Sequence, residues 1–278
     1  MSFFSQIKKV VARKETARSQ DQADNGQRDS RLQADLQLIS AVRNVHQANG
    51  TRSILIRDLP EACFLDDRAS SINGRVTYQT ADEDRLSLLR IGFHGHVDPA
   101  GMEGVEVELQ SICDLQIRFA SSNSKVKVGK GAQGNWIIGL FRAASVEIGD
   151  NVTCNGSIAM VDDGDLIVGD DCMFANTFIH AGDNHAIFDI QSGEPLNVRR
   201  ARIEFESHVW AAARAAIIGD AVIGAGSVIA ADATVKGNVP PCSLVAGVPA
   251  RVVRSGISWT RDPTGRGWEE VVRGLAGT

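Results

Sequence analysis

A six-residue repeat between Phe205 and Arg254 constrains the fold of this 278-residue chain more than any other feature. Consecutive blocks read AAARAA, IIGDAV, IGAGSV, IAADAT and VKGNVP. The first position of the later blocks is large and apolar, and the fifth is smaller: Ile217, Ile223, Ile229 and Val235, against Ala215, Ala221, Ser227, Ala233 and Val239. A period of six fits neither an α-helix nor a lone alternating strand. It predicts short parallel strands stacked in a solenoid, with one large residue of each block inside.

The same rhythm, an apolar run followed by Gly and Asp, begins near Lys125. We therefore assign residues 125–254 to the solenoid. The rhythm breaks in GDNHAIFDIQSGEPLNVRRA, which is too polar to stack as a coil, and it resumes at RIEFESHVW. We predict that residues 182–201 loop out of the solenoid, and long loops on a rigid scaffold often carry function.

Three flanking regions complete the predicted organisation. Residues 1–52 hold two patterns of helical spacing around a polar linker. The first pattern is basic and would lie either on an anionic membrane surface or against the protein itself, and its few apolar residues favour packing. Residues 53–124 show short alternating runs and predict a β-rich lead-in. Residues 255–278 form a tail with a short helical run, RGWEEVVRGL.

Composition excludes several classes of protein. A net charge of −5 provides no basic footprint for nucleic acid. The five cysteines are scattered and never form CxxC, which indicates reduced thiols rather than disulfides or zinc. His94 and His96 share a strand face but have no further His or Cys nearby, so we expect no metal. No apolar run approaches the about 18 residues of a membrane span, and no secretory signal is evident, so a soluble cytoplasmic protein is expected.

Four motifs are more specific than the hexads: CNGSIAMVDD, FANTFIHAGDNH, HVW and VPPCSLVAGVPARVVR. They resemble the galactoside and maltose O-acetyltransferase branch of the hexapeptide-repeat acyltransferases. The resemblance implies a mainly β fold, a left-handed parallel β-helix, and acetyl-CoA as co-substrate. It also implies a homotrimer with cofactor grooves between adjacent solenoids. The acceptor would be a carbohydrate, a hydroxyl of a sugar or surface polysaccharide; a small glycoside, serine or antibiotic is the alternative.

His185, inside the predicted loop, matches the catalytic histidine of that family. Acetyl transfer from a thioester to a hydroxyl requires a base near neutral pH, and a neutral imidazole is suited to this. A loop histidine without a role is the plainer interpretation. His180 lies five residues earlier on the coil and is the competing candidate, whereas His208 is expected to be structural.

The resemblance also marks a cofactor groove. Trp210 matches a tryptophan beside the pantetheine and thiol, and an indole offers a flat apolar face with one N–H donor. Arg251 and Arg254 match basic residues that meet cofactor phosphates, for which guanidinium is well shaped. As ordinary side chains, these three would cover the solenoid flank or be solvated. Ala175 and Ala231 match small residues that line the cofactor groove in the family. Lys236 stands one position before the place where the family has a lysine.

On the acceptor side the resemblance points to Asn155 and Asp163, whose amide and carboxylate would hydrogen-bond sugar hydroxyls. Asp163 also suits a turn, and one role does not exclude the other. The backbone N–H of Ala213 would stabilise the oxyanion. At Ala212 and Ala213 the family usually has a glycine and a small polar residue, and at Gly237 it has the lysine.

The mechanism implied is direct transfer in a ternary complex. His185 takes the proton of the acceptor hydroxyl while its oxygen attacks the thioester carbonyl, and the coenzyme A thiolate leaves and recovers a proton from the imidazolium. No metal and no covalent enzyme intermediate are required. The departures at Ala212, Ala213 and Gly237 support a rival hypothesis, a catalytically silent trimeric scaffold or binding protein with the same fold.

Overall fold

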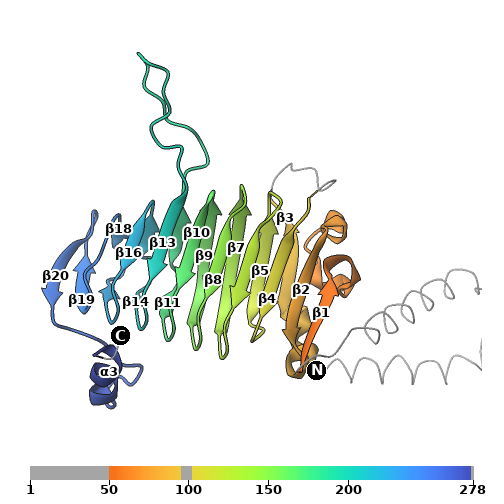
Figure 1. The fold of residues 1–278 in the computed structure, drawn as a ribbon. Helices are drawn as coiled ribbons and strands as arrows, with labels where there is room; N and C mark the ends of the chain where they lie inside the picture. The colour runs from red at the N-terminus through yellow and green to blue at the C-terminus, as the bar shows by residue number, and fades with distance from the viewer. Residues whose placement is uncertain (1–49, 95–101, 277–278) are drawn as a thin grey trace, which may run out of the picture.

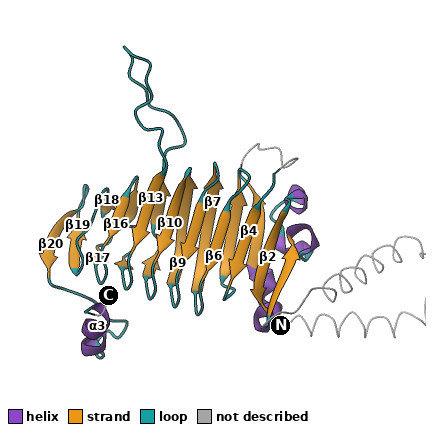
Figure 2. Cartoon of the chain, in the orientation of Figure 1, coloured by secondary structure: helices purple, strands orange, loops and turns teal. Residues whose placement is uncertain are grey.

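The structure is a computed structural model that describes residues 50–94 and 102–276, and strands dominate it (Figure 2). The chain winds in successive coils along one axis, and strands of one coil lie against those of the next (Figure 1). This arrangement is a parallel β-helix, as the six-residue period predicts. The amphipathic segments expected before residue 50, and His96, lie outside the described residues.

One sheet forms the first side of the solenoid, side 1. It has eight strands, of which β1 and β2 are antiparallel and all later neighbours are parallel. In order they are β1 (Thr51–Leu55), β2 (Gly74–Gln79), β4 (Val105–Leu109), β6 (Lys125–Val128), β8 (Ser145–Ile148), β10 (Gly164–Val168), β13 (Ala201–Phe205) and β16 (Ala221–Ile223).

A second sheet of twelve strands bends to form the other two sides. It starts with β3 (Leu89–Phe93), β5 (Asp114–Phe119), β7 (Gln133–Phe141) and β9 (Thr153–Asp162). The first residues of β9 pair with β11, and the later residues pair with β12. The corner of the solenoid therefore falls inside β9, at Asn155 and Gly156.

Side 2 runs from the start of β9 through a series of short strands: β11 (Met173–Ala175), β14 (Trp210–Ala211), β17 (Val228–Ile229) and β19 (Ser243–Ala246). The strand β20 (Arg251–Ser255) pairs antiparallel with β19 at the end of the stack. Side 3 runs from the later part of β9 through β12 (Phe178–Ala181), β15 (Ala216–Ile218) and β18 (Thr234–Val235).

Both repeated positions of the hexad face the interior. The residues that the period places inside are all buried: Ile217, Ile223, Ile229, Val235, Ala215, Ala221, Ser227, Ala233 and Val239. They also pair between coils, since Ile217 lies opposite Val235. The sequence prediction of a core built from one large and one small residue per block is confirmed.

The stack extends farther toward the N-terminus than the hexads indicate. Gly74 lies in parallel register with Val105, and Leu89 with Leu115, so coils already exist upstream of Lys125. The β-rich lead-in expected at 53–124 is thus continuous with the solenoid rather than a region before it. Short 3₁₀ segments interrupt its strands and hide the period: η2 (Ile56–Asp58), η3 (Glu61–Cys63), η4 (Asp67–Ser71) and η5 (Thr80–Leu88).

Two segments leave the regular stack. Residues 182–200 follow β12 and project from the solenoid before β13 begins (Figure 1). This loop lies where the broken rhythm predicts it. After β20 the chain crosses back along the solenoid and ends in the helix α3 (Trp268–Leu275), which matches the short helix predicted in the tail.

Aromatic packing inside the coils gives a direct test of the core. Phe174 is fully buried, with its ring centroid 5.1 Å from that of Trp136 and 5.0 Å from that of Phe205. Removal of the Phe174 ring would leave a cavity into which the neighbouring coils cannot collapse. We therefore expect Phe174→Ala to lower the free energy of unfolding by about 3–5 kcal/mol. Urea unfolding measures this change. Ile190→Ala, at a loop side chain that is 91% exposed, is the control and should stay within about 0.5 kcal/mol of wild type. A similarly small effect for Phe174→Ala would contradict the packing described.

Candidate functional site

Side 2 carries an outward row of side chains that contains Trp210. In register along the axis lie Thr153, Met173, Trp210, Val228 and Leu244, one from each coil. At the end of the row, Arg254 lies opposite Leu244. Parallel register produces this alignment, because successive coils repeat the same strand. The row therefore joins a flat indole to a guanidinium along one surface.

The corner between sides 2 and 3 carries several small residues beside the exposed ion pair of Arg214 and Asp232. Asn155 and Ala175 are in register there, and the amide of Arg214 donates to the carbonyl oxygen of Ala175 over 3.2 Å. One coil farther, the amide of Asp232 donates to the carbonyl oxygen of Ala213 over 3.0 Å, which brings Ala231 to the same corner. The structure thus brings together four of the predicted site residues beside Trp210.

Two further predicted residues lie at the end of this corner. Arg251 lies opposite Ala246 in the pairing of β19 with β20, and both Arg251 and Arg254 are exposed. The amide of Ala213 has no hydrogen-bond acceptor in the described part of the chain, although the amides of Ala212 and Arg214 on either side do. A free N–H, a small-residue corner and two exposed guanidinium groups therefore occupy one strip of surface.

The remaining predicted residues lie at a different corner, where side 3 meets side 1. Asp163 occupies the turn after β9 with a φ of 46°, and the amide of Ala201 donates to its carbonyl oxygen, so its role as a turn residue is confirmed. Its carboxylate lies 3.4 Å from the guanidinium of Arg200. Lys236 follows β18 and is exposed on side 3. The structure does not bring Lys236 to the strip on side 2, because β18 belongs to side 3.

His185 lies in the neck of the projecting loop. Gly182 begins the neck with a φ of 91°, and a Cβ there would lie 2.1 Å from the carbonyl oxygen of Asp162, so only glycine fits. Arg142 binds the buried carboxylate of Asp162 over 2.6 Å and the carbonyl oxygen of Asp183 over 2.9 Å. These contacts fix the direction in which the chain leaves the coil.

Asn197, on the segment of the loop that returns to the solenoid, holds the neck by hydrogen bonds. Its side-chain amide donates to the carboxylate of Asp183 over 3.0 Å and to the carbonyl oxygen of His185 over 2.9 Å. Its side-chain oxygen accepts the amide of Ile187 over 2.6 Å. The backbone of His185 is therefore held on both sides, while its ring is exposed.

His185 and Trp210 do not meet within one chain. Ala175, at the corner next to Trp210, and Gly182, at the loop neck, stand at opposite ends of the four-residue strand β12. At roughly 3.3 Å per residue, that strand alone separates them by more than about 10 Å. Asn155 and Asp163 are separated in the same way along β9. One chain thus presents two half-sites with side 3 between them.

The other histidines take different positions. His180 faces outward on side 3 beside Phe178, with ring centroids 5.9 Å apart, and its Nε2 is buried without a hydrogen-bond partner. His208 is buried in a turn with a φ of 59°. Its Nδ1 lies 2.6 Å from Oδ2 of Asp171 and its Nε2 lies 2.9 Å from the carbonyl oxygen of Trp259. The interpretation of His208 as structural is supported by this saturated environment.

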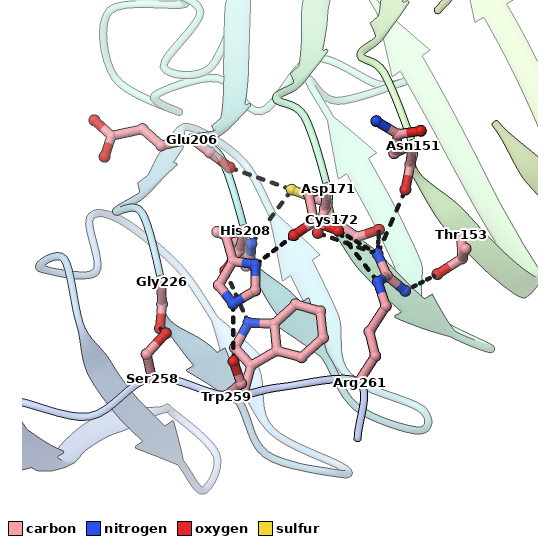
Figure 3. A network of polar contacts seen from close by, with 11 residues as sticks. Asn151, Thr153, Asp171, Cys172, Glu206, His208, Gly226, Ser258, Trp259 and Arg261 are labelled. Atoms are coloured by element: carbon pink, nitrogen blue, oxygen red, sulfur yellow. Dashed lines mark hydrogen bonds and ion pairs between the residues drawn. The ribbon is translucent and has the colours of Figure 1, made fainter. Parts of the chain in front are cut away.

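The tail forms a strap, residues 257–261, along the corner between sides 1 and 2 (Figure 3). Trp259 stacks on His208 with ring centroids 4.3 Å apart and an angle of 9°. Its Nε1 donates to the carbonyl oxygen of His208 over 2.8 Å. Arg261 binds Oδ1 of Asp171 over 2.8 Å and Oγ1 of Thr153 over 2.7 Å.

Charge stabilises the strap. Burial alone would raise the pKa of Asp171, but hydrogen bonds from His208 and Arg261 outweigh it and lower the pKa below the ordinary value. The carboxylate therefore stays ionised near neutral pH and can hold both partners.

The comparisons with known proteins agree with the fold described above. No family model matches the sequence. The chain is 31% identical over 138 residues to the polysialic acid O-acetyltransferase of Escherichia coli O1:K1 / APEC, covering 49% of this chain and 45% of that protein. It is 29% identical over 113 residues to the galactoside O-acetyltransferase of Escherichia coli strain K12, covering 40% and 54%. It spans about half the length of these curated relatives.

Among solved structures, the fold is similar to that of the polySia-specific acetyltransferase NeuO, with a TM-score of 0.60. The match covers 67% of this chain and 92% of that one at 24% identity, which supports the fold. Over 49% and 40% of its length the chain thus resembles O-acetyltransferases in sequence, and it shares the fold of NeuO.

This likeness of fold confirms the left-handed parallel β-helix that the motifs implied. Among the helices of the described ranges, none has the length and apolar character of a membrane span. Within residues 50–94 and 102–276, no three His, Cys, Asp or Glu side chains come together as metal ligands. The roles of the individual site residues stay predictions, and the geometry above locates them.

Sequence reasoning missed residues outside the motifs that hold the predicted site residues in place. Asn197 and Arg142 carry no motif, and their contacts with the loop depend on chain reversals far apart in sequence. Trp259 gave a weak signal, since a tryptophan in a polar tail usually has a packing partner. Its partner, His208, could not be identified without the fold.

The neck of the loop gives the second test. We expect Asn197→Ala to remove three hydrogen bonds from residues 183–187 and to speed amide hydrogen exchange there. The solenoid should keep its stability within about 0.5 kcal/mol, because the loop lies outside it. Exchange followed by mass spectrometry measures both regions. Gln191→Ala, near the loop tip, is the matched control and should leave the neck unchanged. Unchanged exchange at residues 183–187 in Asn197→Ala would show that this side chain does not order His185.

Proposed function

We propose that the chain is an acetyl-CoA-dependent O-acetyltransferase that acetylates a hydroxyl of a sugar or surface polysaccharide. The observation that carries this proposal is the strip on side 2, where Trp210, a corner of alanines and the exposed Arg251 and Arg254 follow one another. Coenzyme A is a long molecule with a thiol and methylene arm at one end and phosphates toward the other. The strip offers an apolar ring, a corner with several alanines and positive charge.

The residues of the strip would have distinct tasks. The indole of Trp210 packs against the pantetheine arm, and the side chains of Ala175 and Ala231 are short enough to leave the corner open. Arg251 and Arg254 bind phosphate oxygens. Lys236, on side 3, has no place in this strip within one chain, and we assign it to the neighbouring half-site.

His185 would act as the general base. It accepts the proton of the acceptor hydroxyl while that oxygen forms a bond to the thioester carbon. The free amide of Ala213 donates a hydrogen bond to the resulting oxyanion. When the carbon–sulfur bond breaks, the imidazolium returns its proton to the departing thiolate, so the imidazole is neutral at both ends of the reaction. Asn155 and Asp163 would orient the acceptor by hydrogen bonds to its other hydroxyls.

Direct transfer is supported by the protonation state of the thiol that stands next to Asn155. Cys154 precedes Asn155 at the corner, and burial raises the pKa of its thiol to about 11. A protonated, buried thiol is a poor nucleophile. An acetyl-cysteine intermediate at this corner is therefore disfavoured, and the acceptor oxygen itself is the nucleophile in the proposal.

A second copy of the chain would complete the site. Side 3 exposes an apolar row in register, made of Ile137, Ile158 and Phe178, which are 40%, 37% and 41% exposed. A contiguous apolar row of this kind marks an interface. Packing side 3 of one copy beside side 2 of the next would bring His185 to the neighbouring Trp210. Such a head-to-tail contact closes into a ring, and the family resemblance favours three copies.

The acceptor class and the compartment follow from the same proposal. The relatives are named for polysialic acid and galactosides, and we extend a carbohydrate acceptor to this chain. The cytoplasm is the proposed location, since the cysteines of the described residues are unpaired thiols.

Calorimetric titration of acetyl-CoA and coenzyme A into the purified protein tests the proposal. We expect micromolar binding that Trp210→Ala and Arg251→Ala each weaken by about tenfold or more, because each removes one contact of about 1.4 kcal/mol. Trp268→Ala and Arg266→Ala alter exposed tail residues and serve as matched controls that keep wild-type affinity. No binding to the folded wild-type protein would contradict the transferase and favour the silent scaffold.

A further inference from the structure

The strap spans the solenoid along its axis. Ile257 donates its amide to the carbonyl oxygen of Cys242 over 3.0 Å, and Oγ of Ser258 donates to that of Gly226 over 3.2 Å. The next contacts, described above, are with His208, with Asp171 and with Thr153. The first four of these acceptors belong to the corner turns of four consecutive coils, and Thr153 is the first residue of β9 in the next coil. The strap therefore runs parallel to the outward row of side 2 and directly beside it.

Trp259 occupies the middle of the strap and is held more tightly than its neighbours. It is only 7% exposed, and its ring, its Nε1 and its carbonyl oxygen all contact His208. The guanidinium of Arg261 lies 5.4 Å from the ring centroid of Trp259. The orientation of this indole is consequently fixed by its stack on His208 and by the hydrogen bond of its Nε1.

The same indole touches Trp210. The two ring centroids are 6.0 Å apart and the rings are tilted by 48°. Trp210 is only partly buried and makes its strand contacts through its backbone. Trp259 is thus an aromatic wall beside the indole of Trp210.

We propose that Trp259 is a positioning residue for the cofactor strip: it holds Trp210 in the orientation that receives the pantetheine arm of acetyl-CoA. This inference rests on the proposed function. It adds the C-terminal tail to a site otherwise built from the repeats. A fixed indole binds more tightly than a mobile one, because the cost of ordering its side chain is met before the ligand arrives.

A purely structural strap is the alternative, in which Trp259 only ties coils together. The two ideas differ in what each variant changes. Arg261→Ala loosens the strap at its far end but leaves Trp259 on His208. Trp259→Leu keeps an apolar side chain under the strap but removes the wall beside Trp210. Trp259→Phe restores a flat ring without the Nε1 donor.

The experiment measures acetyl-CoA affinity by calorimetry and thermal stability for these three variants, with Trp268→Ala as the tryptophan control. The exciton signal of the two indoles in the circular dichroism spectrum of Arg261→Ala reports whether that variant keeps their relative orientation without any ligand. We expect Trp259→Leu to weaken acetyl-CoA binding about tenfold. Trp259→Phe should recover most of the affinity. Arg261→Ala should lower stability and leave affinity near that of wild type.

Each result decides between the ideas. Wild-type affinity in Trp259→Leu, or equal losses of affinity in Trp259→Leu and Trp259→Phe, would overturn this inference and leave the proposed function intact. Weakened binding in Arg261→Ala to the same extent as in Trp259→Leu would also overturn it, since the whole strap rather than the ring would then matter. Failure of the wild-type protein to bind acetyl-CoA would overturn both.

Discussion

The rest of the structure depends on the parallel register between coils. Each coil must place one large residue inside at each repeat, as Ile217 and Val235 do, so that every strand lies on its counterpart. Because the strands are fixed, the corners between them are fixed as well. Residues far apart in sequence, such as Asn155 and Ala231, then stand in line along one corner. The stacking that buries the core also arranges the strip on which the proposed chemistry depends.

The same geometry places the predicted site residues at two different corners of the solenoid. The rigid strand β12 keeps the loop neck away from Trp210, and no movement of the loop tip changes this. The neck itself is built as firmly as the coils, through Gly182, Arg142 and Asn197. In the proposed trimer, each interface would therefore join two preformed halves rather than order a flexible one, which lowers the cost of assembling a reactive geometry.

The sequence predicted what the period controls and missed what it does not. The buried hexad positions, the projecting loop and the tail helix all follow from local patterns, and the structure confirms them. The start of the solenoid was placed too late, because 3₁₀ segments such as η5 interrupt the hexads. The family motif groups Lys236 with Arg251, but Lys236 follows β18, which belongs to side 3. Contacts such as Trp259 with His208 join residues 51 positions apart and leave no local pattern.

The central claim, a transferase site shared between copies, is tested most directly by complementation. In coenzyme A release with polysialic acid or a simple galactoside as the probe acceptor, His185→Ala is expected to be inactive, and Trp210→Ala is expected to be about tenfold slower when acetyl-CoA is subsaturating. Unfolding and refolding the two variants together should restore about a quarter of the wild-type rate, because random assortment pairs an intact His185 with a neighbouring intact Trp210 at that frequency. Wild-type activity without any recovery in the mixed protein would contradict a shared site.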